Sequence, residues 1–231
     1  MLRVGLTGGL GSGKSTAARM FAAHGAFVLS SDEIGRALMQ PGEQVYAAIV
    51  ARFGKAVVAV DGSLARAALA RIAFGDGSES SSHSDGSNHI EELNAIVHPA
   101  VIARQAELIA EIAARDPSAI VIVESALIFE TKHGGESGWH KRFDKIVFVK
   151  ASEDLKIARF IQRASHARSL TPAEREQLGA DARRRLANQA DSDHNAALSD
   201  YVLINNGPLD SLQQQVDVLW PELLAAARER A

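Results

Sequence analysis

Short apolar runs alternate with longer, helix-length segments along this chain. Five runs rich in Val, Ile, Leu and Phe lie at residues 2–8, 26–32, 119–127, 143–151 and 200–206. Because the segments between them are long enough for covering helices, the pattern favours parallel strands. The sequence therefore predicts an α/β fold, a doubly wound five-stranded parallel sheet with helices on both faces.

Helical patterns also fill the stretch between the second and third runs. The turn signals QPGE and VDGS punctuate them, and we expect a helical insertion over about 35–115 on one side of the sheet. Residues 75–89 inside it are rich in Gly, Ser and Asp and predict a mobile spacer loop. His83 and His89 supply too few ligands at helical spacing to predict a metal site.

A second helical region, residues 155–190, is rich in arginine. Thr171 can cap the helix that opens at Pro172, and Glu174 completes a capping box with it. The pattern therefore predicts an arginine-rich helical arm.

The composition is that of an ordinary globular protein, with 231 residues of which 46% are hydrophobic and 23% charged. This length favours one domain with insertions, spanning residues 1–231. A net charge of −3 gives no general electrostatic attraction for nucleic acid or for an anionic membrane surface. Any anion site must therefore be local, and we expect small-molecule ligands, no nucleic acid and no obligate protein partner.

The absence of cysteine excludes disulfides and thiolate metal sites, which agrees with a reducing compartment. The first residues, MLRVGLTGG, reach glycine too early for the apolar stretch of a signal peptide. No run approaches the ~18 apolar residues that a membrane span needs. We therefore expect a cytoplasmic protein that makes no use of membranes.

A glycine-rich loop joins the first predicted strand to the helix after it. The stretch GGLGSGKST, residues 8–16, fits the pattern G-x-x-x-x-G-K-[ST]. Backbone N–H groups can converge on one phosphate where side chains do not block them, and the following helix adds the positive end of its dipole. The alternative is a turn whose glycines only let strand and helix pack closely. The strand before the loop and the helix after it favour nucleotide binding.

Six residues of this loop are predicted to hold ATP. Lys14 would reach the β and γ phosphates as a point charge and take part in catalysis, while the Ser15 hydroxyl would join the coordination shell of Mg²⁺. Thr16 would lie near the α phosphate. The predicted nucleotide site comprises Gly11, Ser12, Gly13, Lys14, Ser15 and Thr16.

Glycine loops of this kind serve switches, motors and kinases, so other residues must decide the function. The chain lacks the Asn-Lys-x-Asp motif of guanine-specific switches and is short for a motor, which favours a small-molecule kinase. Asp32 follows the second predicted strand, at the sheet edge where such folds bind ligands, and suits a general base. Its alternative role is an N-cap. Arg36, one turn later, either binds an anionic substrate group or lies on a solvated helix face.

The chain resembles the dephospho-coenzyme A kinase family over nearly its whole length. The resemblance implies a P-loop kinase that transfers phosphate from ATP to the ribose 3′-hydroxyl of dephospho-CoA, the last step of coenzyme A synthesis. A nucleoside or nucleotide kinase and an ATP-dependent regulator are the alternatives. The motifs that carry the resemblance are GLTGGLGSGKS at 5–15, SDEIGR at 31–36, FG at 53–54, DGSLARAAL at 61–69, LNAIVHP at 93–99, ALIFE at 126–130, RLANQ at 185–189 and SDYVLINNG at 199–207.

The resemblance also implies roles for residues outside the loop. Asp32 matches the family's proposed base, and the helical insertion would receive dephospho-CoA while the arginine-rich arm closes over ATP as a lid. His98 could instead be a histidine at a helix end before Pro99. The matching positions are Thr7, Arg36, Arg66 and His98 on the acceptor side, Arg163 and Arg185 on the lid, and Asn205 near the adenine.

Three departures from the family pattern concern the positioning of the substrate and the lid rather than the class of reaction. The family usually reads Asp-Ala-Asp where this chain has Ser30, Ser31 and Asp32, so one carboxylate is missing and the proposed base is retained. Ala126 stands where proline is usual, and a lysine is missing near Asn195.

Overall fold

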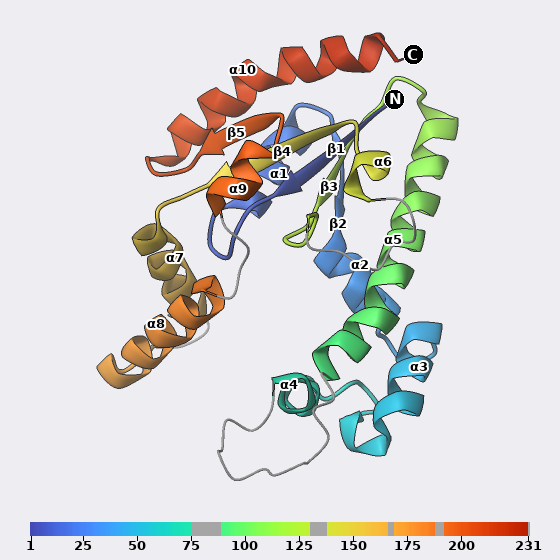
Figure 1. Ribbon diagram of the computed structural model, residues 1–231, viewed down its shortest axis with the longest axis vertical. Helices are drawn as coiled ribbons and strands as arrows, with labels where there is room; N and C mark the ends of the chain where they lie inside the picture. Colours follow the sequence, from blue (N-terminus) through green and yellow to red (C-terminus); the bar gives the residue numbers. More distant parts are fainter. Residues whose placement is uncertain (75–88, 130–137, 166–168, 188–191, 231) are drawn as a thin grey trace. The chain divides into compact units, whose positions relative to one another are not determined.

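The computed structural model describes residues 1–74, 89–129, 138–165, 169–187 and 192–230, and Figure 1 traces their helices and strands. These residues divide into two compact units. The core unit holds residues 1–30, 109–129 and the described residues from 138 onward. The helical unit holds residues 31–74 and 89–108.

A five-stranded sheet forms the centre of the core unit. All four neighbouring pairs of strands run parallel, in the order β2-β3-β1-β4-β5. The predicted parallel sheet and its five strands are therefore confirmed. The strands are β1 (Leu2–Thr7), β2 (Phe27–Ser30), β3 (Ile120–Glu124), β4 (Lys145–Lys150) and β5 (Tyr201–Ile204).

Helices cover both faces of this sheet, as expected for strands that read as continuous apolar runs. On one face, α1 (Lys14–Ala23) and α10 (Leu209–Arg228) pack with alternate strand residues such as Val4 and Ile122. On the other face, Val121 and Val123 pack with the last turns of α5 (His89–Arg115) and with Trp139 of α6 (Trp139–Arg142). The alternation of side chains along β3 thus feeds two separate cores.

The arginine-rich arm forms two consecutive helices, α7 (Glu153–Ser165) and α8 (Pro172–Ala187). The predicted capping box is confirmed at the start of α8: the Thr171 N–H donates to Glu174 Oε2 at 2.8 Å, and the Glu174 N–H donates to Thr171 Oγ1 at 3.3 Å. After the arm, α9 (Ser192–Ala197) leads into β5.

The helical unit contains α2 (Ser31–Leu38), α3 (Gln44–Phe53), the short η1 (Lys55–Val57), α4 (Arg66–Phe74) and the first part of α5. Its own small core is built on three buried side chains, those of Val45, Ile49 and Val57. The unit corresponds to the predicted helical insertion. Of the predicted spacer loop, residues 75–88 lie outside the described residues, and the expectation of a single domain stays a prediction.

One sequence interpretation needs correction here. A helix end was one reading of His98, but α5 continues through Pro99 to Arg115. Proline removes one backbone donor without stopping a helix whose neighbouring turns are held by packing, and Val97 and Ala100 do pack on the small core.

Within the described residues, no helix is both long and apolar enough to cross a bilayer.

One buried carboxylate ties the starts of two strands together. Asp144 precedes β4, and its side chain, 4% exposed, accepts hydrogen bonds from Arg3 N–H at 2.8 Å and from Arg3 Nη2 at 2.8 Å. Arg230 Nη1 reaches the same carboxylate at 2.7 Å. Burial alone would raise the pKa of Asp144, but the hydrogen bonds and charge of Arg3, with the charge of Arg230, outweigh it and lower this pKa.

Asp144→Asn is therefore expected to lower the free energy of unfolding at neutral pH by about 2 kcal/mol. Because the folded-state pKa is depressed, this contribution is present above the unfolded-state pKa of about 3.9 and is lost as pH falls through the folded-state value. Urea unfolding of both proteins between pH 7 and pH 3 should show the difference shrinking in acid. The surface variant Asp154→Asn is the control, and a difference that persists unchanged in acid would contradict the assignment.

Candidate active site

The glycine-rich loop lies between the end of β1 and the start of α1, as predicted. Lys14 Nζ donates to the carbonyl oxygens of Gly8 at 2.6 Å and of Gly9 at 3.2 Å, so its ammonium spans the loop. No described side chain caps α1, whose N-cap residue is Gly13. The first N–H groups of a helix are then available to an anion, which also interacts favourably with the helix dipole.

Two glycines of the loop are required by close neighbours as well as by backbone conformation. Gly13 has φ +99°, and a Cβ there would lie 2.1 Å from Asn205 Nδ2. Gly11 has φ +71°, and a Cβ there would lie 2.5 Å from the carbonyl oxygen of Lys156. These neighbours belong to the turn after β5 and to α7, so segments around the loop leave no room for side chains at either glycine, and the predicted binding of phosphate stays a prediction.

Glu124 stands beside the loop serine, and the sequence analysis did not single it out. Ser15 Oγ donates to Glu124 Oε1 at 2.6 Å. Glu124 ends β3, in register with Leu6 on one side and Ser30 on the other. A hydroxyl and a carboxylate so placed offer two hard oxygen ligands, the type that Mg²⁺ prefers.

A signal for Glu124 was present in the sequence. It is the acidic residue directly after the apolar stretch IVIV in the predicted run 119–127, and parallel sheets bind ligands at the carboxyl edge of their strands. The motif that fixed attention on Ser15 says nothing of its partner, because 109 residues separate the two.

Asn205 lies against the loop rather than open to it. Its side chain is 7% exposed, and Nδ2 donates to the carbonyl oxygen of Ser12 at 2.8 Å. Its Oδ1 accepts from Arg159 Nη2 at 3.2 Å. Both ends of the amide are thus used inside the protein, which favours support of the loop, and the predicted contact with adenine stays a prediction.

The predicted lid arginines lie on both helices of the arm. Arg163 is exposed on α7. Arg185 Nε pairs with Asp181 Oδ2 at 2.9 Å, and its guanidinium lies 5.5 Å from the centre of the Phe160 ring. A cation over an aromatic face is held in a defined direction, so Arg185 is ordered within the arm.

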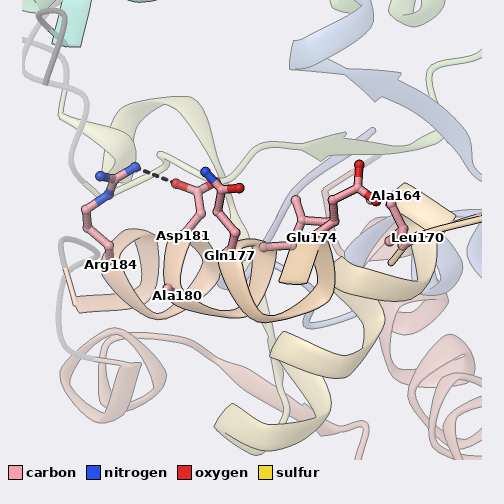
Figure 2. Close-up of a pocket in the computed structure, with 8 residues that line it drawn as sticks. Ala164, Leu170, Glu174, Gln177, Ala180, Asp181 and Arg184 are labelled. Atoms are coloured by element: carbon pink, nitrogen blue, oxygen red, sulfur yellow. Dashed lines mark hydrogen bonds and ion pairs between the residues drawn. The ribbon is translucent and has the colours of Figure 1, made fainter. Parts of the chain in front are cut away.

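A groove of about 620 Å³ runs along the arm beside these residues. Figure 2 shows the side chains of Glu174, Gln177, Asp181 and Arg184 projecting from α8, with the ion pair between Arg184 and Asp181 at 2.7 Å. The groove is lined by Ala164, Leu170, Glu174, Gln177, Leu178, Ala180, Asp181 and Arg184.

Asp32 lies in the first turn of α2, two residues after β2 ends. The helix begins at Ser31, so Asp32 is inside it and the N-cap reading is wrong. Ser31 Oγ accepts from Gln105 Nε2 at 2.8 Å, and Gln105 is 3% exposed. This bond fixes the start of the helix that carries Asp32. Asp32 and Arg36 are both exposed on α2.

Three further residues that were predicted to lie on the acceptor side differ in their structural environment. Thr7 ends β1 and is 2% exposed. His98 lies inside α5, and the side chain of Arg66 lies outside the described part of the chain. None of these positions tests the contact with substrate that was predicted for it.

Two lysines interact with Asp193 of α9, close in sequence to Asn195, where the family lysine is missing. Lys150 Nζ pairs with Asp193 Oδ1 at 2.5 Å, two residues before Asn195. Lys156 is 8% exposed, and burial lowers the pKa of its ammonium, with Glu153 and Asp193 opposing and Lys150 adding to the shift. Two lysines on β4 and α7 therefore lie near α9, although residue 195 itself is asparagine.

Known proteins resemble this chain in sequence throughout. The sequence profile of a family described as dephospho-CoA kinase matches residues 2–211. The chain is 37% identical to a dephospho-CoA kinase of Streptomyces avermitilis over 229 residues, which cover 99% of this chain and 97% of that protein. It is 35% identical to a dephospho-CoA kinase of Thermobifida fusca over 223 residues, 96% of each chain.

Solved structures resemble it in fold. The protein TT1252 from Thermus thermophilus gives a TM-score of 0.69 at 28% identity, covering 96% of this chain and 97% of that one. A dephospho-CoA kinase from Campylobacter jejuni gives a TM-score of 0.54 over 96% of both chains. At 16% identity, the similarity to the Campylobacter jejuni protein supports the fold alone.

Proposed function

Since the chain belongs to the dephospho-CoA kinase family and phosphorylates dephospho-CoA with ATP in the last step of coenzyme A synthesis, we propose a role for each residue of its site. The motif resemblance is thereby confirmed, and the alternatives of a nucleoside kinase or an ATP-dependent regulator lose their support. The observation that carries the proposal is the phosphate loop, with Lys14 across it and Ser15 on Glu124.

The loop is proposed to hold the triphosphate of ATP. Residues Gly11 to Thr16 would supply backbone N–H groups, and Lys14 would exchange the carbonyls of Gly8 and Gly9 for the β and γ phosphates. Such an exchange is favourable because a phosphate oxygen carries full negative charge and a carbonyl does not.

Ser15 and Glu124 are proposed to hold Mg²⁺ together with ATP. Their two oxygens are 2.6 Å apart and of the hard type that the ion prefers, so the residues present fit the metal. When bound, Mg²⁺ neutralises charge on the β and γ phosphates during transfer.

Asp32 is proposed to act as the general base. Its carboxylate would take the proton of the ribose 3′-hydroxyl while that oxygen attacks the γ-phosphorus in line, and the bond from the γ-phosphorus to its bridging oxygen would break to release ADP. The support is the match of SDEIGR to the family motif and the place of Asp32 two residues beyond the carboxyl end of β2.

The remaining site residues are proposed either to contact dephospho-CoA or to neutralise charge on the transferring phosphoryl group. Thr7, Arg36, Arg66 and His98 would contact dephospho-CoA, and Arg163 and Arg185 would neutralise the transferring phosphoryl group while the closed arm excludes water. A cytoplasmic location and the absence of an obligate protein partner stay predictions.

The reaction is tested by ADP release in a coupled assay. Release should depend on dephospho-CoA, and adenosine, uridine and nucleoside monophosphates should not replace it. ADP release that is indifferent to dephospho-CoA would overturn the proposed site as a whole.

Glu124→Gln is expected to raise the Mg²⁺ concentration for half-maximal rate by about 10- to 100-fold, a typical cost of losing a residue that orients or charges a metal site. The amide can still accept from Ser15 but lacks the negative charge. Initial rates titrated with Mg²⁺ at saturating ATP measure the effect. Glu229→Gln, an exposed residue after α10, is the matched control, and an unchanged Mg²⁺ dependence for Glu124→Gln would show that this carboxylate does not serve the metal.

A further inference from the structure

Two consecutive asparagines fasten three segments at the carboxyl edge of the sheet. Asn205 Nδ2 donates to the carbonyl oxygen of Ser12 in the phosphate loop at 2.8 Å. The Asn205 N–H donates to the carbonyl oxygen of Lys150 at 2.8 Å, and Asn206 Oδ1 accepts from the Ser152 N–H at 2.7 Å. The phosphate loop, the end of β4 and the approach to α7 are therefore joined through one turn after β5.

Arg159 of α7 determines which way the Asn205 amide faces. Its Nη2 donates both to the backbone carbonyl oxygen of Asn205 at 3.0 Å and to Oδ1 at 3.2 Å. A carboxamide has one accepting and one donating end. With Oδ1 held by a cation, Nδ2 must face Ser12, and the reversed amide would set two oxygens against each other.

Two polar atoms of this arrangement are buried without a hydrogen bond within the described part of the chain, which is energetically unfavourable. Arg159 Nη1 and Ser12 Oγ are both buried without a hydrogen-bond partner among the described residues. A buried donor left unpaired is unfavourable, so its retention calls for a reason. One such reason is that Arg159 fixes the direction in which the Asn205 amide faces the loop.

We propose that Arg159 is a positioning residue for ATP. It acts through Asn205, which holds the Ser12 carbonyl away from the phosphates and keeps the N–H groups of the loop turned toward them. This inference rests on the proposed role of the loop in holding ATP. Gly13 completes the arrangement, because only a residue without a side chain leaves room for the Asn205 amide.

The test compares Arg159→Ala, Arg159→Lys, Asn205→Ala and the double variant Arg159→Ala/Asn205→Ala. Arg159→Ala is expected to raise the Kd of ATP, measured by calorimetric titration, and the KM for ATP by about tenfold, the equivalent of one lost hydrogen bond to a charged group. The KM for dephospho-CoA should stay unchanged. Arg159→Lys, which keeps a donor but loses the fork, should restore part of the affinity.

The double variant distinguishes the proposed route from independent effects. If Arg159 acts through Asn205, the double variant should bind ATP no more weakly than Asn205→Ala alone. Arg228→Ala, a surface arginine at the end of α10, should leave every constant unchanged. Thermal melting of each variant distinguishes loss of fold from a specific effect on ATP binding. Loss of fold lowers the active fraction of the protein without changing the KM for ATP or for dephospho-CoA.

Unchanged ATP affinity in a folded Arg159→Ala protein would overturn the proposal, as would strictly additive effects of the two substitutions. If the protein bound no ATP at all before substitution, the proposed role of the loop would fail instead, and the two failures are therefore distinguishable.

Discussion

Asp32→Asn is expected to lower kcat by about two to four orders of magnitude while ATP still binds, because the amide cannot accept the proton of the attacking hydroxyl. The substitution keeps the size of the side chain and lies on an exposed helix face, so the fold should survive. The measurement is kcat from dephospho-CoA-dependent ADP release, together with the Kd of ATP from titration.

Glu33→Gln is the matched control for this experiment. Glu33 is the next residue of α2, is also exposed and carries the same charge, so it reports the general electrostatic effect of neutralising one carboxylate there. Its kcat should stay close to that of the unsubstituted enzyme. If both variants keep full activity, another group accepts the proton and the role of Asp32 is lost.

Gly13→Ala is expected to weaken ATP binding by about 100-fold or more, the scale of a misplacement near 1 Å at a reacting group. Its Cβ would lie 2.1 Å from Asn205 Nδ2, a distance that real Cβ atoms do not show. Either the amide is driven off the Ser12 carbonyl or the loop itself moves. Titration with ATP and the KM for ATP both measure the loss.

Gly25→Ala separates backbone strain from this collision. Gly25, after α1, has φ +102°, close to the +99° of Gly13, but a Cβ there meets nothing within 4 Å. The substitution Gly25→Ala should therefore lower the free energy of unfolding by about 1 kcal/mol through backbone strain alone. Its ATP affinity should be unchanged. Equal losses of ATP affinity in the two variants would show that strain, and not the contact with Asn205, makes Gly13 necessary.

The loop that these variants probe is supported from three sides. Glu124 meets it from β3, Asn205 from the turn after β5, and the backbone of Lys156 from α7. Each support reaches the loop at a glycine or a small polar residue. We infer that the bare loop is kept in shape by its neighbours as much as by its own conformation.

Much of the fold could be predicted because its signals are local. The strand runs, the glycine motif and the capping box at Thr171 each depend on residues within a few positions of one another. The two corrections concern helix boundaries, at Asp32 and at His98, where tertiary packing decides how far a helix extends.

The candidate site was predicted in part. Lys14 and Ser15 follow from the motif. Glu124 was missed, and Arg159 was predicted only as part of the arginine-rich arm at 155–190, because neither belongs to a short pattern with a known mechanism. The predicted contacts of Thr7, Arg36, Arg66 and His98 with substrate are still to be tested by substitution.

What the sequence determined by itself is the chemistry available, since a glycine loop with its lysine and serine is specified by neighbouring positions. Only the tertiary structure decided which groups meet that loop. Glu124 is 109 residues from Ser15, and Asn205 is 193 residues from Ser12. Strand order brings these residues together, and strand order depends on the packing of whole elements, which no local pattern records.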